Sequence, residues 1–483
     1  MAESLWTFDE VLAASGGVAE GEGAPDIHQV AIDSRGLGAG ALYVAIKGDR
    51  LDGHQFVGNA FKAGAVASLV ERGADLPEPA GALIRVDDTL QALNMLGEAA
   101  RARTKARVIA VTGSVGKTGT KEALRVALAP SGATHVSQKS FNNQWGVPLS
   151  LANLPRDARF GVFEVGMNHA GEITPLAQMI RPDIAIVTTV EPVHLEFFDS
   201  LEAIAEAKAE VFHGLVPGGT AILNSDSPFY DLLRGRAEER GAGTVLDFGT
   251  GAQAFARLGE TVFEADGSSV EAFIGNQRLT YRIGAPGRHL VVNSLAVLAG
   301  VHAAGAELEK AAARLGRYGA QKGRGERGVL KVAGGEIAII DESYNANPAS
   351  MRAALMAMAH TPRQTFGRRV AVLGDMLELG QAGAALHREL AEPVDAAGVD
   401  VVLACGPLMA ELYEVLPESR RGGYAETSED LEPILIEAIS PGDVVMVKGS
   451  LGSRMGPLVE ALRVHLQDSG ATRIEPAGTM AGK

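Results

Sequence analysis

Short apolar runs alternate with amphipathic stretches along most of the chain, a pattern that predicts parallel β-strands separated by helices. The run Val108–Val111 precedes a glycine-punctuated turn over Thr112–Thr118, and the stretch Lys121–Leu128 has the pattern of a helix. The elements predicted next are a strand over Phe160–Val165, a helix over Glu172–Ile180, a strand over Ile184–Thr189 and a helix over Leu201–Leu215. This alternation predicts a doubly wound parallel sheet that binds ligands at the carboxyl ends of its strands.

Two further α/β segments flank this central one. Before it, the pattern predicts strands over Ala41–Ile46 and Ala65–Val70 and a helix over Val57–Ala63. Behind it, a second doubly wound domain without a phosphate loop is predicted from the strands Ile337–Ile340, Val370–Leu373, Val401–Ala404 and Val444–Val447.

The predicted fold class is therefore α/β with three domains. We expect a small N-terminal domain over residues 1–104, a central domain over 105–332 and a C-terminal Rossmann-like domain over 333–483. Within the central domain, Thr244–Arg282 predicts short strands of a β-rich insertion, and Gly287–Ala304 predicts a helix. The tail from about residue 468 is expected to be disordered.

Composition and charge exclude several classes of protein. A chain of 483 residues is too long for a single core, and 46% hydrophobic with 21% charged residues is typical of a globular protein. No apolar run reaches the ~20 residues that span a bilayer, and acidic residues near the start argue against a signal peptide. The net charge of −15 argues against a nucleic-acid partner, and the single cysteine, Cys405, is expected to be a buried thiol in a cytoplasmic protein.

The turn at Thr112–Thr118 has the sequence of a phosphate-binding loop, T-G-x-x-G-K-T. A strand, a glycine turn and a helix N-terminus direct backbone N–H groups at an anion, while Lys117 reaches terminal phosphates and the Thr118 hydroxyl faces a magnesium ion. Val111 stands where the first glycine of the usual motif belongs. The combination nevertheless predicts a nucleoside triphosphate as ligand.

Glu164 ends the predicted strand Phe160–Val165 and is expected at the same sheet edge as the loop. A carboxylate there completes the coordination of a magnesium ion held by Thr118, because Mg²⁺ takes few protein ligands beside phosphate oxygens. His194, in a loop after a strand, is a candidate metal ligand, although a lone histidine is more often without such a role.

Lys208 lies on the apolar stripe of the predicted helix Leu201–Leu215. A buried lysine is costly unless it is paired, neutral or modified, and burial makes its free amine available for carbamylation by carbon dioxide. The alternative is a lysine that extends to water or pairs with Glu196 or Glu210. Periodicity alone leaves both interpretations open.

Assembled, these features resemble the Mur ligases of peptidoglycan synthesis along nearly the whole chain. The shared motifs are the phosphate loop, Glu164, the histidine of VHLEFF, the lysine of EAKAEVF, Asn293 in GRHLVVNSLA and Arg324 in KGRG. The motifs SFNNQWGVPLSL, DESYNANPASM, GDMLELG and VKGS are most similar to the member that adds D-alanyl-D-alanine. Gly119 and Trp145 depart from the residues that relatives carry at these positions.

The resemblance implies a role for each matching residue. It makes Lys117, Lys208, His194 and Glu164 catalytic, and it gives two Mg²⁺ ions the ligands Thr118, Glu164, His194 and Lys208 as a carbamate. The residues implied around ATP are Thr112, Gly113, Ser114, Val115, Gly116, Lys117, Thr118, Gly119, Asn142, Asn143, Asn293, Arg324 and Asp341. Those implied for the uridine nucleotide are Ser34, Arg35, Lys47, Asp52 and His54. Weaker candidates on the acceptor side are Tyr344, Asn345, Asn347 and Asp375.

The implied activity is an ATP-dependent ligase that joins D-alanyl-D-alanine to UDP-N-acetylmuramoyl-tripeptide through an acyl phosphate. Its partners are these small molecules, without nucleic acid or membrane, and the protein is expected to be a cytoplasmic monomer. The alternatives are a Mur-type ligase that adds a single amino acid and a nucleotide-dependent switch, although the chain lacks the N-K-x-D motif of guanine-binding switches.

Overall fold

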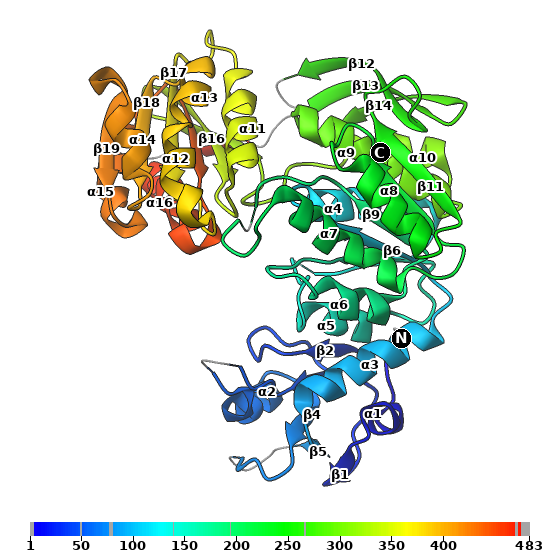
Figure 1. Cartoon of the computed structure of the whole chain (residues 1–483). Helices are drawn as coiled ribbons and strands as arrows, with labels where there is room; N and C mark the ends of the chain where they lie inside the picture. Colours follow the sequence, from blue (N-terminus) through cyan, green and yellow to red (C-terminus); the bar gives the residue numbers. More distant parts are fainter. Residues whose placement is uncertain are drawn as a thin grey trace, which may run out of the picture.

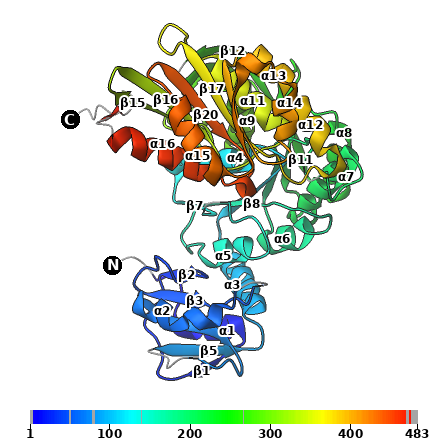
Figure 2. The same cartoon turned by 90° about the vertical axis from the view of Figure 1, so that its left-hand side faces the viewer.

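The computed structural model describes residues 4–48, 51–76, 81–138, 140–193, 195–264, 267–468 and 472–474. Three α/β domains follow one another, and each is built on one sheet (Figure 1). The first domain lies below the central domain in both views, and the third lies beside the central domain (Figures 1 and 2). The predicted α/β class and three-domain organisation are confirmed. No helix among the described residues is both long and apolar enough to cross a membrane.

The first domain contains a five-stranded sheet in the order β1-β5-β4-β3-β2. Strands β2 to β5 are parallel, because a helix or a long loop returns the chain between them, and β1 pairs antiparallel with β5. The three elements predicted here form with ends shifted by up to two residues. The elements are α1 (Phe8–Ser15), β1 (Val18–Glu20), β2 (Gln29–Ala31), β3 (Ala41–Val44), α2 (Val57–Lys62), β4 (Ala65–Glu71), β5 (Ala82–Val86) and α3 (Thr89–Arg103).

The central domain contains a nine-stranded sheet in the order β14-β13-β12-β11-β10-β9-β6-β8-β7. Apolar residues of α4, α9 and α10 cover one face, and those of α5, α6, α7 and α8 cover the other. The elements up to β11 are β6 (Arg107–Thr112), α4 (Lys117–Leu128), β7 (Thr134–Val136), α5 (Gly146–Ala152), β8 (Phe160–Glu164), α6 (Ile173–Ile180), β9 (Ile184–Val187), α7 (Leu201–Ala209), β10 (Thr220–Asn224), α8 (Tyr230–Glu239) and β11 (Thr244–Gly249).

The predicted β-rich stretch forms strands that extend the central sheet beyond β11. Strand β12 pairs parallel with β11, and the hairpins to β13 and β14 then extend the same sheet. Helix α9 packs on β11, β12 and β13, so these strands share the central core. The remaining elements are β12 (Ala256–Glu264), β13 (Gly267–Ile274), β14 (Gln277–Ile283), α9 (Arg288–Ala303) and α10 (Leu308–Leu315).

The third domain contains a seven-stranded sheet in the order β19-β18-β17-β20-β16-β15-β21. Its helices cover both faces, and Cys405 is buried at the end of β18. The elements are β15 (Glu326–Val332), β16 (Gly335–Glu342), α11 (Pro348–Ala359), β17 (Arg368–Gly374), α12 (Gly383–Arg388), α13 (Ala391–Ala396), β18 (Val401–Cys405), α14 (Ala410–Val415), β19 (Arg421–Ala425), α15 (Ser428–Ala438), β20 (Asp443–Lys448), α16 (Gly456–Asp468) and β21 (Thr472–Ile474).

Two expectations about this domain need correction. A boundary after residue 332 assigns β15 to the central domain, whereas β15 pairs with β16 along its whole length and belongs to the third sheet. The tail expected to be disordered from about 468 includes β21, which pairs antiparallel with the otherwise open edge of β15. The other residues after 468 lie outside the described part of the chain.

The first and central domains are joined through Asn153, which follows α5. Its Oδ1 accepts a hydrogen bond from Val30 N at 2.9 Å, and its Nδ2 donates to Val30 O and to Leu149 O, both at 2.8 Å. The Asn153 side chain therefore hydrogen-bonds to both the N–H and the C=O group of Val30, a buried residue of β2, and links the first domain to the central domain. Nearby, the Trp6 indole donates to Ala152 O at 2.8 Å.

Replacing Asn153 with alanine is expected to lower the free energy of unfolding by about 1–3 kcal/mol, since it leaves two backbone groups of Val30 without partners. Thermal unfolding followed by calorimetry measures the change. The matched control is Asn59→Ala, at an exposed position in α2, which should leave the transition unchanged. An equal effect of both substitutions would contradict this role of Asn153.

The central and third domains meet at the loop after β9. Leu195 packs against the apolar cores of both domains. Its neighbour Glu196 donates its backbone N–H to Glu378 O at 3.3 Å, and Gly380 approaches closely enough that a Cβ there would lie 3.2 Å from the Cα of Glu196. Across the cleft, Arg324 Nη2 donates to Ser140 Oγ at 3.3 Å.

Candidate active site

The glycine turn joins β6 to α4 and begins the helix at Lys117, four residues earlier than predicted. Gly113 and Gly116 have φ values of 140° and 89°, which L side chains rarely adopt. A Cβ at Gly113 would lie 2.0 Å from Thr188 Oγ1, and one at Gly116 would lie 2.4 Å from Asn293 Nδ2. Close packing therefore requires glycine at both positions. The contact at Gly116 also shows that Asn293, which lies far away in the sequence, is beside the loop.

Lys117 folds back over this turn. Its Nζ donates to Gly113 O at 2.7 Å and to Ser114 O at 3.3 Å. Burial lowers the pKa of Lys117, while the nearby Glu164 carboxylate opposes this change and Arg324 adds to it. A partly buried cation at this position interacts favourably with an anion at the helix N-terminus.

Glu164 ends β8 beside the loop and is only 1% exposed. Its Oε1 accepts a hydrogen bond from Asn142 Nδ2 at 2.8 Å, whereas the buried Oε2 has no hydrogen-bond partner among the described residues. Thr118 Oγ1 lies 3.3 Å from Ser140 Oγ in the same site. Glu164 and Thr118 line the same cavity, and a carboxylate oxygen without a partner together with a hydroxyl is a donor set that a hard cation such as Mg²⁺ uses.

Lys208 is buried in α7, with 2% of its surface exposed. Burial, and then the positive charge of Lys117, hold the pKa of Lys208 well below its ordinary value. The interpretation that it extends to water is wrong. Pairing with Glu210 is also wrong, because that carboxylate binds the backbone of Gly171 and Thr174, and no ion pair of Lys208 occurs among the described residues. A neutral buried amine is the form that reacts with carbon dioxide.

A cavity of about 1060 Å³ connects the phosphate loop to the third domain. The predicted residues that line it are Ser114, Val115, Gly116, Lys117, Thr118, Gly119, Asn142, Glu164, Asn293, Arg324, Tyr344, Asn345 and Asn347. Arg324 lies over the Tyr344 ring, with its guanidinium carbon 4.0 Å from the ring centroid. The structure thus brings the nucleotide and acceptor candidates to one cavity.

Other predicted residues lie behind the cavity wall. Both oxygens of Asp341 accept hydrogen bonds from its neighbours, one from Gly323 N and the other from Ser343. Asn143 accepts from Gly146 N at the start of α5. Asp375 accepts from Leu408 N and Met409 N, and burial raises its pKa. Thr112, Gly113 and Lys208 do not line the cavity either, and His194 lies outside the described residues.

The five residues expected at the uridine nucleotide make their contacts in two groups. Arg35 lines a smaller cavity, of about 210 Å³, between β2 and the central domain, where it pairs with Asp33 and follows Ser34. His54 is buried instead: its Nδ1 lies 2.6 Å from Asp52 Oδ1, and its Nε2 accepts from Glu71 N at 2.9 Å. Lys47 forms a backbone bridge with Asp52.

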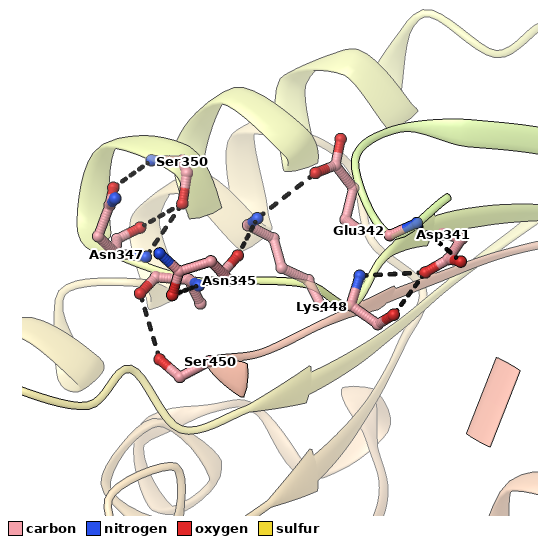
Figure 3. A network of polar contacts seen from close by, with 10 residues as sticks. Asp341, Glu342, Asn345, Asn347, Ser350, Lys448 and Ser450 are labelled. Carbon is pink, nitrogen blue, oxygen red and sulfur yellow. Dashed lines mark hydrogen bonds and ion pairs between the residues drawn. The ribbon is translucent and has the colours of Figure 1, made fainter. Parts of the chain in front are cut away.

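Among the lining residues that were not predicted as site residues are Ser140, Glu342 and Lys448. Lys448 Nζ donates to Asn345 O at 2.9 Å and to Glu342 Oε2 at 3.5 Å (Figure 3). The signal for Lys448 was present, since a lysine at the carboxyl end of an apolar strand is costly to bury. Ser140 and Glu342 lie in the motifs SFNNQWGVPLSL and DESYNANPASM, which carry the family resemblance.

Comparison with known proteins agrees with this arrangement. Three family models match: "Mur ligase family, catalytic domain" over residues 26–104, "Mur ligase middle domain" over 111–301 and "Mur ligase, glutamate ligase domain" over 323–451. Together they match well over half of the chain. The chain belongs to the Mur ligase family. It is therefore an ATP-dependent ligase, and the interpretation as a nucleotide-dependent switch is not supported.

Within the Mur ligases, several similar proteins share one name. UDP-N-acetylmuramoyl-tripeptide–D-alanyl-D-alanine ligases of Bacillus subtilis and Escherichia coli are each 34% identical to this chain over 90% of its length and 93% of theirs. A crystal structure of MurF from Acinetobacter baumannii has a TM-score of 0.79 and 29% identity, covering 95% of this chain and 98% of that one. MurF from Thermotoga maritima in complex with ADP has a TM-score of 0.74 and 26% identity, covering 91% and 98%.

Proposed function

We propose that this Mur ligase joins D-alanyl-D-alanine to UDP-N-acetylmuramoyl-tripeptide in the cytoplasm, as a monomer. The names of its relatives support this proposal, because they match over about 90% of both chains. The structural observation that carries it is the single cavity between the phosphate loop and the DESYNAN segment of the third domain. A ligase needs both, since one wall activates a carboxylate and the other delivers an amine.

The proposed reaction has two steps. The carboxylate oxygen of the tripeptide attacks the terminal phosphorus of ATP, which forms an acyl phosphate and releases ADP. The amine of the dipeptide then attacks the acyl carbon, the tetrahedral intermediate loses phosphate as the C–O bond breaks, and the amine proton passes to solvent. Because two anions meet in the first step, Lys117 stabilises the transferred phosphoryl group by charge.

The donor atoms at the loop suit Mg²⁺. Thr118 and Glu164 would hold one ion, and the Glu164 Oε2 atom without a hydrogen-bond partner supports this assignment. His194 and Lys208 would serve a second ion, with Lys208 as a carbamate formed when its neutral amine adds to carbon dioxide and loses a proton. Bound Mg²⁺ would supply charge neutralisation to the phosphates.

The remaining assignments follow the family pattern. Lys117 to Gly119, the loop before them, Asn142 and Asn293 would contact ATP, and Arg324 would do so from the third domain. Asp341 and Asn143 would act by holding the neighbouring turns. Arg35, Ser34, Lys47, Asp52 and His54 would serve the uridine nucleotide, and Tyr344, Asn345, Asn347 and Asp375 the acceptor side.

Glu164→Gln is expected to raise the Mg²⁺ concentration for half-maximal activity by about 10- to 100-fold. Glutamine keeps an oxygen for Asn142 but removes the negative charge from the metal side. Initial rates at saturating ATP over a Mg²⁺ series measure the effect. Glu206→Gln, which changes an exposed carboxylate paired with Arg236, is the matched control. An unchanged Mg²⁺ requirement would exclude Glu164 as a ligand.

Phosphate release from ATP tests the proposed activity. Release is expected only when UDP-N-acetylmuramoyl-tripeptide and D-alanyl-D-alanine are both present, and mass spectrometry should show the pentapeptide product. The assay is run with tripeptides ending in lysine and in diaminopimelate, which also identifies the third residue. Turnover that depends on free D-alanine or on a diamino acid instead would overturn the proposal.

A further inference from the structure

Lys448 is a buried cation in the wall of the active-site cavity. It ends β20, the strand between β16 and β17, and only 2% of it is exposed. Glu342 is its registered neighbour on β16. The lysine Nζ donates to Asn345 O at 2.9 Å and lies 3.5 Å from Glu342 Oε2 (Figure 3).

Two contacts leave one donor unused. An ammonium group has three N–H donors, and the third has no acceptor among the described residues. Burial lowers the pKa of Lys448, and Arg324 acts in the same direction, whereas Glu342 favours the charged form. A buried charge with an unused donor on a cavity wall is suited to an anionic ligand.

Asn347 and Ser350, at the start of α11, bond to each other and not to Lys448. Asn347 caps α11 with its own side chain, whose Oδ1 accepts from Ser350 N at 2.8 Å, and Ser350 Oγ in turn accepts from Asn347 N at 3.0 Å. These contacts pair the backbone N–H groups of Asn347 and Ser350. Small apolar side chains of Ala346, Ala349 and Ala353 line the cavity nearby.

We infer that Lys448 binds the carboxylate of the acceptor dipeptide, an inference that rests on the proposed function. D-alanyl-D-alanine has an amine that reacts, a carboxylate that keeps its charge throughout and two methyl groups. A cation at Lys448 beside small apolar side chains matches the unreactive end of this molecule. Lys448 is then a specificity-determining residue that selects acceptors with a free carboxylate.

A purely structural role for Lys448 makes a different prediction. A lysine that only ties Asn345 to β20 would support every acceptor equally, because it would not touch the ligand. Comparison of D-alanyl-D-alanine with D-alanyl-D-alaninamide separates the two roles, since the amide keeps the amine and the methyl groups but lacks the negative charge.

The test is the ratio of kcat/KM for the acid to kcat/KM for the amide. In the wild-type enzyme we expect the acid to be preferred by about 10- to 100-fold, as for a charge-assisted hydrogen bond. In Lys448→Met the ratio should fall to about one, with unchanged KM for ATP. Lys331→Met, at an exposed position on β15, should keep the wild-type ratio.

A reduced rate with an unchanged ratio in Lys448→Met would overturn the inference and leave the structural role. If the methionine variant does not fold, Lys448→Gln is measured in the same way. Failure of the proposed function is distinguishable, because then the wild-type enzyme would not use D-alanyl-D-alanine at all.

Discussion

Lys117→Met is expected to lower kcat/KM for ATP by about a thousandfold, because the methionine cannot supply charge to the transferred phosphoryl group. The Lys117 ammonium donates to Gly113 O and Ser114 O in the loop, and we expect phosphate to replace these acceptors when ATP binds. Steady-state initial rates with all three substrates measure the effect.

The pH dependence provides an independent check. Because burial lowers the pKa of Lys117, its charged form is lost as pH rises through a value below that of a free lysine. In the wild-type enzyme, kcat/KM for ATP should therefore decline on the alkaline side, and this limb should be absent from Lys117→Met. Lys105→Met, which changes an exposed lysine before β6, should behave as wild type. If kcat/KM for ATP of Lys117→Met still declined at alkaline pH as in the wild type, this decline would belong to a group other than Lys117.

Lys208→Ala is expected to lose ligase activity by at least about a hundredfold, and added bicarbonate should not restore it, because the carbamate must be attached to this lysine. The wild-type protein incubated with isotope-labelled bicarbonate should show a carbamate signal by NMR that Lys208→Ala lacks. Lys310→Ala, on the surface of α10, is the control for loss of a lysine. Wild-type turnover in Lys208→Ala would show that the buried amine is not required.

Helical periodicity alone does not determine whether the Lys208 side chain is buried. A lysine on an apolar helical stripe is either buried or extends its ammonium group to water, and the spacing does not distinguish these two outcomes. The local structure determines the outcome for Lys208, because α7 ends at Ala209 and continues as a tighter 3₁₀ turn over Glu210–Gly214. Glu210 lies in that turn and binds Gly171 and Thr174, so it is not available to the lysine.

Local sequence patterns predicted most helices and strands, but they could not predict contacts between segments that lie far apart in the sequence. The phosphate loop and Glu164 were predicted because each lies at a recognisable strand or helix end, whereas Asn293 was implied by the family resemblance. The pairing of β15 with β16 and the contact of Arg324 with Ser140 depend on segments far apart in sequence. The contacts of His54 are of the same kind, because its ring pairs with the Asp52 carboxylate and with the backbone N–H of Glu71 on β4.

The buried thiol of Cys405 can be used to measure opening of the third domain. It is the single cysteine of the chain, and burial raises its pKa to about 11. At pH 7 only about one thiol in ten thousand would be ionised, so a thiol-specific reagent modifies the protein chiefly when the end of β18 opens to solvent. The labelling rate of the unmutated protein therefore reports how often its third domain opens at Cys405. Slower labelling with substrates present would show that substrate binding makes this opening rarer.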